Sequence, residues 1–116
     1  MLMGLEIQAP AETVTMGEGL GIQRSELLGI VRGGGFSAPV MGFKSTRMAA
    51  RRYLEPDFPP RLMAKDLRVA VQAASENGRD LAMAAAAGVA HDRARGNGLA
   101  DLDCAAIADA LNGSQP

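Results

Sequence analysis

Apolar residues recur along the chain at helical spacing. The clearest case is FPPRLMAKDLRVAVQAA, residues 58–74, where apolar positions three or four apart share one helical face. These positions are Met63, Leu67, Ala70, Val71 and Ala74. Alternating runs of β-branched and aromatic residues, which are typical of strands, do not occur in the sequence. The pattern therefore predicts an all-α fold.

Glycines and prolines divide this pattern into six expected helices. The helices are expected at residues 2–16, 24–31, 38–52, 58–77, 81–95 and 101–111. Pro10 lies inside the first, and a proline there removes a hydrogen bond and clashes with the preceding turn, so we expect a kink or a break within residues 6–10. Pro39 is expected in the first turn of the third helix, which tolerates proline. The short links predict one six-helix bundle, a single domain over residues 1–116.

Lys65 interrupts the apolar run near the start of the fourth expected helix, at a position where a lysine needs an explanation. At 100° per residue it lies about 200° from Met63 and points away from the apolar stripe. The first turns of a helix carry a partial positive charge, which disfavours a cation. Lys65 is either a solvated surface lysine, the commoner case, or a side chain that reaches an anionic or polar group outside this domain.

Composition narrows the class of protein. The net charge is −1, with 12 Lys and Arg against 13 Asp and Glu, which gives no electrostatic case for nucleic acid or an anionic membrane as a partner. The longest apolar run, residues 81–90, is too short to span a bilayer. No signal peptide is visible, and the single cysteine, Cys104, is expected as a small buried residue in a reducing compartment. We therefore expect a cytoplasmic protein.

Two glycine-rich segments and the single histidine offer little catalytic chemistry. GEGLGI and RGGGF lack the G-x-G-x-x-G spacing and follow no expected strand, so we expect left-handed glycines at helix ends. A zinc site built on histidine and cysteine ligands would have only His91 and Cys104. His91 lies near an expected helix C-terminus, where the helix dipole favours a cation.

The segment KSTRMAARR is the strongest basic cluster. Lys44, Arg47 and Arg51 share a helical face, and Arg52 follows them. Such a face is either solvated, the commoner case, or able to contact phosphate.

Several motifs occur in a characteristic order. Phe58 is followed after six residues by Lys65-Asp66-Leu67. Around this segment lie PAETVTMGEGLGI, RSELLGIVRGGG and NGLADLDCAAIADAL, the last containing Asp101 and Asp103. The order and spacing over nearly the whole chain resemble the C-terminal helical domain of the β-hydroxyacid dehydrogenases, the 3-hydroxyisobutyrate dehydrogenase-like enzymes.

The resemblance implies a fold of the 6-phosphogluconate dehydrogenase C-terminal-domain type. It also implies that this domain packs against a Rossmann domain, with the active site in the crevice between them. Lys65 would then approach the nicotinamide of NAD or NADP, Asp66 would orient Lys65, and Phe58 would join them in the cofactor-binding set. No metal is implied.

The chain departs from the family at positions that matter for catalysis. The family's catalytic lysine, in a Gly-x-x-x-Lys motif, and an asparagine four residues later would both fall before Met1. The G-x-G-x-x-G turn of the Rossmann domain is not in the sequence, Pro10 replaces a helix former, and the fifth helix lacks the family's proline and tyrosine. We therefore assign no catalytic residue and expect the isolated chain to be inactive.

Two functions follow as hypotheses. The first is the C-terminal domain of an NAD(P)-dependent dehydrogenase acting on a small 3-hydroxy acid. The second is a free-standing all-α interaction or oligomerisation module without redox activity. In either case the first helix should expose apolar residues and support a homo-oligomer. Those residues are Leu2, Leu5, Ile7 and Met16.

Overall fold

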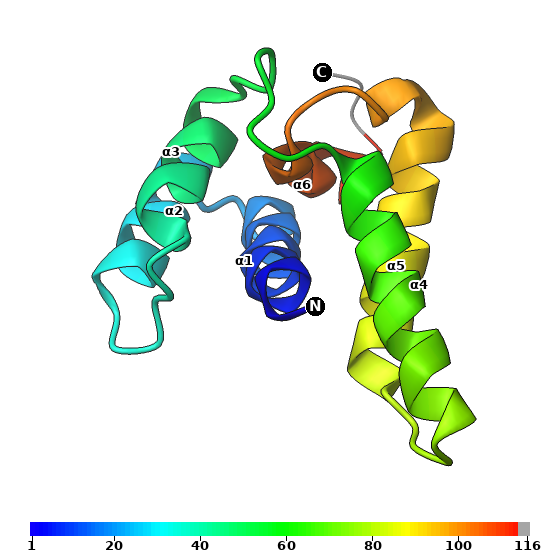
Figure 1. Ribbon diagram of the computed structural model, residues 1–116. Coiled ribbons are helices and arrows are strands. Elements are labelled where there is room, and N and C mark those ends of the chain that lie inside the picture. The colour runs from blue at the N-terminus through cyan, green and yellow to red at the C-terminus, as the bar shows by residue number, and fades with distance from the viewer. Residues whose placement is uncertain (114–116) are drawn as a thin grey trace.

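The computed structural model describes residues 1–113, and every regular element in this part of the chain is helical (Figure 1). The α-helices are α1 (Leu2–Gly19), α2 (Arg24–Gly33), α3 (Met41–Ala50), α4 (Pro60–Glu76), α5 (Ala82–Ala94) and α6 (Ile107–Leu111). The predicted all-α fold is confirmed. The expected domain over residues 1–116 also includes residues 114–116, which lie outside the described part.

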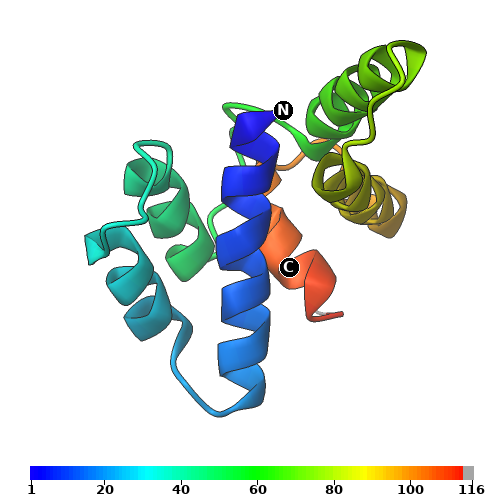
Figure 2. The ribbon, with the colours of Figure 1, turned by 90° about the horizontal axis from the view of Figure 1, so that it is seen from below.

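The helices form two pairs on either side of α1. Figure 2 shows α1 passing between the α2–α3 pair and the α4–α5 hairpin, with α6 packed against it. The largest fully buried apolar side chains come from α1, α2, α3, α4 and α6 and belong to one contiguous core. They are Ile7, Val14, Leu28, Met48, Met63, Leu67 and Ile107. The central position of α1 therefore joins both pairs into one core.

The first helix is longer and more regular than the sequence predicts. It continues without a break through Pro10 to Gly19, so the expected break is wrong. Side chains of α4 reach the backbone of α1 at one point: a Cβ added at Gly4 would lie 2.9 Å from Met63 Sδ of α4. Glycine therefore leaves room for the Met63 side chain.

One side of α1 is buried and the other is open. Ile7 is fully buried, which corrects the expectation that it is exposed, because it lies on the face that packs into the core. Leu2 and Met16, by contrast, are 66% and 63% exposed. The apolar side predicted from Leu2 and Met16 is therefore the open side of the helix.

Several helix ends differ from the predicted ones. Pro39 precedes α3 and does not lie in its first turn. Helix α5 continues into a π-helical turn, Arg95–Leu99, and α6 is preceded by a 3-10 turn, Cys104–Ala106. Gly21 has a left-handed φ of 81°, as expected, but the glycines of RGGGF do not have one: Gly33 is the last residue of α2, and Gly34 after it is extended.

None of the helices in residues 1–113 is both long enough and apolar enough to cross a membrane.

Candidate functional site

Helix α4 begins at two prolines that fix its direction. Pro59 is the N-cap residue in an extended conformation, and Pro60 is the first helical residue, where a missing N–H costs nothing. The Pro59 carbonyl accepts hydrogen bonds from the backbone N–H groups of Leu62 and Met63. The start of α4 is thus well defined; it carries two of the predicted site residues, Lys65 and Asp66, and the third, Phe58, precedes it.

Lys65 lies on the solvent side of α4, as its spacing predicts. Met63 and Leu67 are buried on the opposite side, whereas the Lys65 side chain is 61% exposed. Its Nζ lies 3.4 Å from Oδ1 of the half-exposed Asp66. The Lys65 amine is therefore exposed to solvent and paired with a neighbouring carboxylate.

Phe58 is placed by a different set of contacts. It lies just before the N-cap of α4, is half-buried, and packs against the core. Its carbonyl oxygen accepts a hydrogen bond of 2.9 Å from the backbone N–H of Cys104. The structure therefore pairs Lys65 with Asp66 but anchors Phe58 to the segment before α6.

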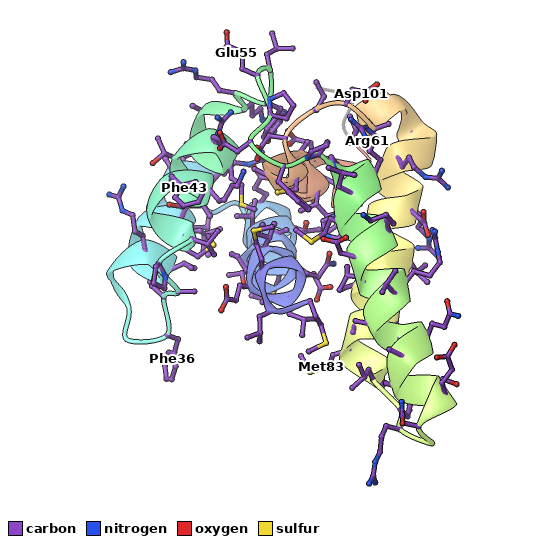
Figure 3. The ribbon with its side chains drawn as sticks, viewed as in Figure 1. Phe36, Phe43, Glu55, Arg61, Met83 and Asp101 are labelled. Atoms are coloured by element: carbon purple, nitrogen blue, oxygen red, sulfur yellow. The ribbon has the colours of Figure 1, made fainter. Side chains whose placement is uncertain are left out.

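A second contact between chain segments lies beside the start of α4. Arg61, in the first turn, donates a hydrogen bond of 3.0 Å to Oδ1 of Asp101, and Figure 3 shows the two side chains next to each other. Both side chains are largely exposed, so this pair contributes little to stability. It still connects the start of α4 to the segment that ends in Asp103.

Asp103 is the buried acid of this region, and sequence reasoning assigned it no separate role. Its Oδ2 lies 2.5 Å from Lys44 Nζ and also accepts the backbone N–H of Asp57 at 3.1 Å. Its Oδ1 accepts the N–H of Ala105 and caps the 3-10 turn. Burial alone would raise the pKa of Asp103, but these hydrogen bonds and the charge of Lys44 hold it below its ordinary value.

Lys44 does not belong to a solvated or phosphate-binding face, and both interpretations of the basic cluster are wrong for this residue. Its side chain is 1% exposed, because it lies on the face of α3 that also buries Met41 and Met48. That face is the signal that sequence reasoning missed: a lysine between two buried methionines requires a buried acid. Asp103 supplies it.

The arginines of the cluster are also engaged within the protein. Arg47 pairs with Asp57 at 3.1 Å, and Arg51 lies 3.6 Å from Asp109. Asp109 is fully buried and pairs with Arg24 at 2.7 Å. The described structure therefore uses these guanidinium groups to join helices.

His91 is buried, which corrects its interpretation as a helix-end cation. It is fully enclosed, and neither ring nitrogen has a hydrogen-bond partner among the described residues. Burial lowers its pKa to about 4, although the charge of Asp92 acts in the other direction. Cys104 is buried as predicted, and burial raises the pKa of its thiol to about 11, which makes it a poor nucleophile.

Lys65 is an exposed hydrogen-bond donor near the start of α4, and the half-buried Phe58 precedes that helix. Within residues 1–113 there is no strand to carry a glycine-rich dinucleotide turn.

Comparisons with known proteins identify sequence relatives of this chain. Residues 1–111 match the family described as NAD-binding of NADP-dependent 3-hydroxyisobutyrate dehydrogenase. Glyoxylate/succinic semialdehyde reductase 1 of Arabidopsis thaliana is 33% identical over 115 residues, and the chloroplastic glyoxylate/succinic semialdehyde reductase 2 of the same plant is 29% identical. These matches cover 99% of this chain but only 39% and 32% of the two reductases.

Proposed function

This chain belongs to the NAD-binding family of NADP-dependent 3-hydroxyisobutyrate dehydrogenase, and we propose that it forms the helical side of a nicotinamide site in such an oxidoreductase. The observation that carries the proposal is the outward-facing, 61% exposed Lys65, held by Asp66 on a rigid helix.

The cofactor's role and the residues' roles are distinct. The nicotinamide, when bound, supplies or accepts the hydride. Lys65 donates hydrogen bonds to the nicotinamide or its ribose, Asp66 limits the positions of the Lys65 amine, and Phe58 lines the apolar side. NAD and NADP both suit these residues, because the discriminating contacts lie near the adenosine ribose.

The proposed substrate is a small hydroxy acid of the 3-hydroxy type, interconverted with its aldehyde acid. Support for the 3-hydroxy class comes from the family, which is described by 3-hydroxyisobutyrate dehydrogenase. The two Arabidopsis relatives are described as reductases of glyoxylate and succinic semialdehyde, whose reduction gives a 2-hydroxy and a 4-hydroxy acid, so they support only the wider class of short carboxylates with an aldehyde group. The chain spans 39% and 32% of the lengths of these two reductases, so it would act with a cofactor-binding domain, and by itself it would turn over no 3-hydroxy acid.

The open side of α1 is the proposed surface for that domain. Exposed Leu2 and Met16 lie on this side, and beside them a groove of about 570 Å³ runs between α1 and α2. Ile30 and Phe36 at its rim are 66% and 106% exposed. A continuous apolar surface of this kind requires a cover, and in the isolated chain a second copy would supply it and form a homo-oligomer.

A fusion enzyme tests the proposal. In it, this chain replaces the matching segment of the Arabidopsis reductase 1. Lys65→Met should raise the KM for NADPH by about tenfold or more, because a hydrogen bond from a charged donor is worth about 1.5–3 kcal/mol. Arg79→Met is the matched control, since Arg79 is an exposed cation at the far tip of the α4–α5 hairpin.

Equal KM values for Lys65→Met and the unchanged fusion enzyme would contradict the proposal. Turnover by the isolated chain, at a rate that follows its concentration during purification, would contradict the expected need for a second domain. A monomer in sedimentation at high micromolar concentration would contradict the assigned role of the open side of α1.

A further inference from the structure

We infer that Asp103 is a positioning residue. Through its contacts with Lys44 and with two backbone N–H groups, it holds segment 53–58 in place. Phe58, the last residue of this segment, is thereby kept where a cofactor and substrate would meet it. The inference rests on the proposed function for its consequence in catalysis. The positioning itself rests only on contacts within this chain.

Segment 53–58 has few means of holding its own shape. It forms no helix, Leu54 is 78% exposed, and Glu55 has a left-handed φ of 58°. Figure 3 shows this segment projecting beyond the helices, with Glu55 near its tip. A non-glycine residue in that conformation persists only when the surrounding structure fixes it.

The segment is fixed at both ends by two consecutive residues, Asp103 and Cys104. The backbone N–H of Asp103 donates to the carbonyl of Tyr53 at 2.8 Å, and the N–H of Cys104 donates to the carbonyl of Phe58 at 2.9 Å. Between these points, the Asp103 carboxylate accepts the N–H of Asp57. Phe58 is therefore positioned by a short stretch of chain, Asp103 and Cys104, that lies far from it in the sequence.

The carboxylate of Asp103 has a function that an apolar side chain could not replace. Lys44 and Asp103 are both almost completely buried, and a buried ion pair is often no more stable than a well-packed apolar pair. An apolar pair, however, could not accept the N–H groups of Asp57 and Ala105. The acid thus determines where the segment lies more than it determines how stable the domain is.

A second buried ion pair provides a matched control. Asp109 is as buried as Asp103 and pairs with Arg24 at 2.7 Å. Its neighbours are Arg24, Arg51 and the Tyr53 side chain, at the beginning of the segment and away from Phe58. Loss of Asp109 should therefore destabilise the domain without displacing Phe58.

Fluorine NMR tests the positioning in the chain itself. The chain has three phenylalanines, Phe36, Phe43 and Phe58, so 4-fluorophenylalanine gives three signals. Asp103→Asn should shift or broaden the Phe58 signal, whereas the signal of the fully exposed Phe36 should not change. Asp109→Asn should leave the Phe58 signal in place.

A double variant separates positioning from stability if Asp103→Asn does not fold. Lys44→Met with Asp103→Leu replaces the ion pair by apolar side chains and should melt close to the unchanged chain. Its Phe58 signal should nevertheless be displaced, because the acceptor for the N–H of Asp57 is gone. An unchanged Phe58 signal in this variant, or in a folded Asp103→Asn, would overturn the inference.

The fusion enzyme then measures the consequence for catalysis. The double variant should lower kcat/KM by about 10- to 100-fold, as expected when a group that contacts the reactants is displaced by about 1 Å. Asp109→Asn should lower it much less at a temperature where both variants are folded. Equal losses in the two variants would reduce Asp103 to a structural residue and overturn the inference.

The two proposals can fail separately. If Lys65→Met leaves the KM for NADPH unchanged while substitution of Asp103 shifts the Phe58 signal, the proposed function is wrong and the positioning stands as geometry alone. If Lys65→Met raises that KM while substitution of Asp103 leaves the Phe58 signal unchanged, the function stands and the positioning is wrong.

Discussion

The chain has two lysines, and they lie in opposite environments. Lys44 on α3 is 1% exposed and pairs with the fully buried Asp103. Lys65 on α4 is 61% exposed and pairs, within residues 1–113, only with its half-exposed neighbour Asp66. Lys44 is enclosed by the protein that its ion pair helps to hold together. Lys65 points to solvent from a helix whose opposite side packs into the core.

The difference shows how a cation becomes available for a ligand. A buried lysine has its charge neutralised by a fixed acid, so its donors are occupied and its removal leaves that acid unpaired. An exposed lysine on a rigid helix contributes almost nothing to stability, and its donors remain free. The two residues should therefore respond in opposite ways to the same substitution.

The largest effect is expected for Lys44→Ala. Removing Lys44 leaves Asp103 buried and unpaired, which should cost about 3–5 kcal/mol of unfolding free energy. Urea denaturation followed by circular dichroism would measure it. A loss below about 1 kcal/mol would mean that water reaches Asp103 and that the two lysines differ less than the structure indicates.

Leu67→Ala sharpens the comparison on the helix of Lys65 itself. Leu67 is fully buried and lies two residues away on the opposite side of α4. Truncation of a buried leucine typically costs about 2–5 kcal/mol. Thermal melts of Leu67→Ala and Lys65→Ala, recorded side by side, should place the first well below the second.

His91 adds a third environment: it is a buried titratable base whose ring has no hydrogen-bonded acid among residues 1–113. Its pKa of about 4 lies below the ordinary 6.5, so the folded state prefers the neutral ring. The stabilisation is complete above pH 6.5 and is lost as the pH falls toward 4, by about 2 kcal/mol between pH 7 and pH 5. In urea denaturation at both pH values, His91→Leu should show a correspondingly smaller decrease; an equal decrease in both proteins would assign the pH dependence to other groups.

The smallest effect on stability is expected for Lys65→Ala. Its side chain makes one exposed ion pair, so the melting curve should correspond to a change within about 0.5 kcal/mol. A destabilisation as large as that of Leu67→Ala would show that Lys65 is structural, and the proposed contact with the cofactor would lose its basis.

The sequence predicts the helices well, and it predicts the orientation of Lys65, because both follow from local periodicity. It does not predict the burial of Lys44 or His91, since burial depends on what packs against a helix from elsewhere in the chain. Asp103 is a distant partner of this kind: its contacts with Lys44 and Asp57 join segments far apart in sequence. The continuity of α1 through Pro10 is a similar case, in which packing on both sides overrides the local preference against proline.

The position of Asp103 after helices α1 to α5 has a consequence for synthesis. On the ribosome, helices α1 to α5 are complete before Asp103 appears, and until then Lys44 has no buried acid to pair with. The start of α4 also lacks the backbone donors of Asp103 and Cys104 that anchor Tyr53 and Phe58. Contacts this far apart in sequence form late because their loop-closure entropy must be overcome first. Nascent chains arrested before residue 103 should therefore be helical but protease-sensitive at segment 53–58. They should become resistant only when α6 has left the ribosome.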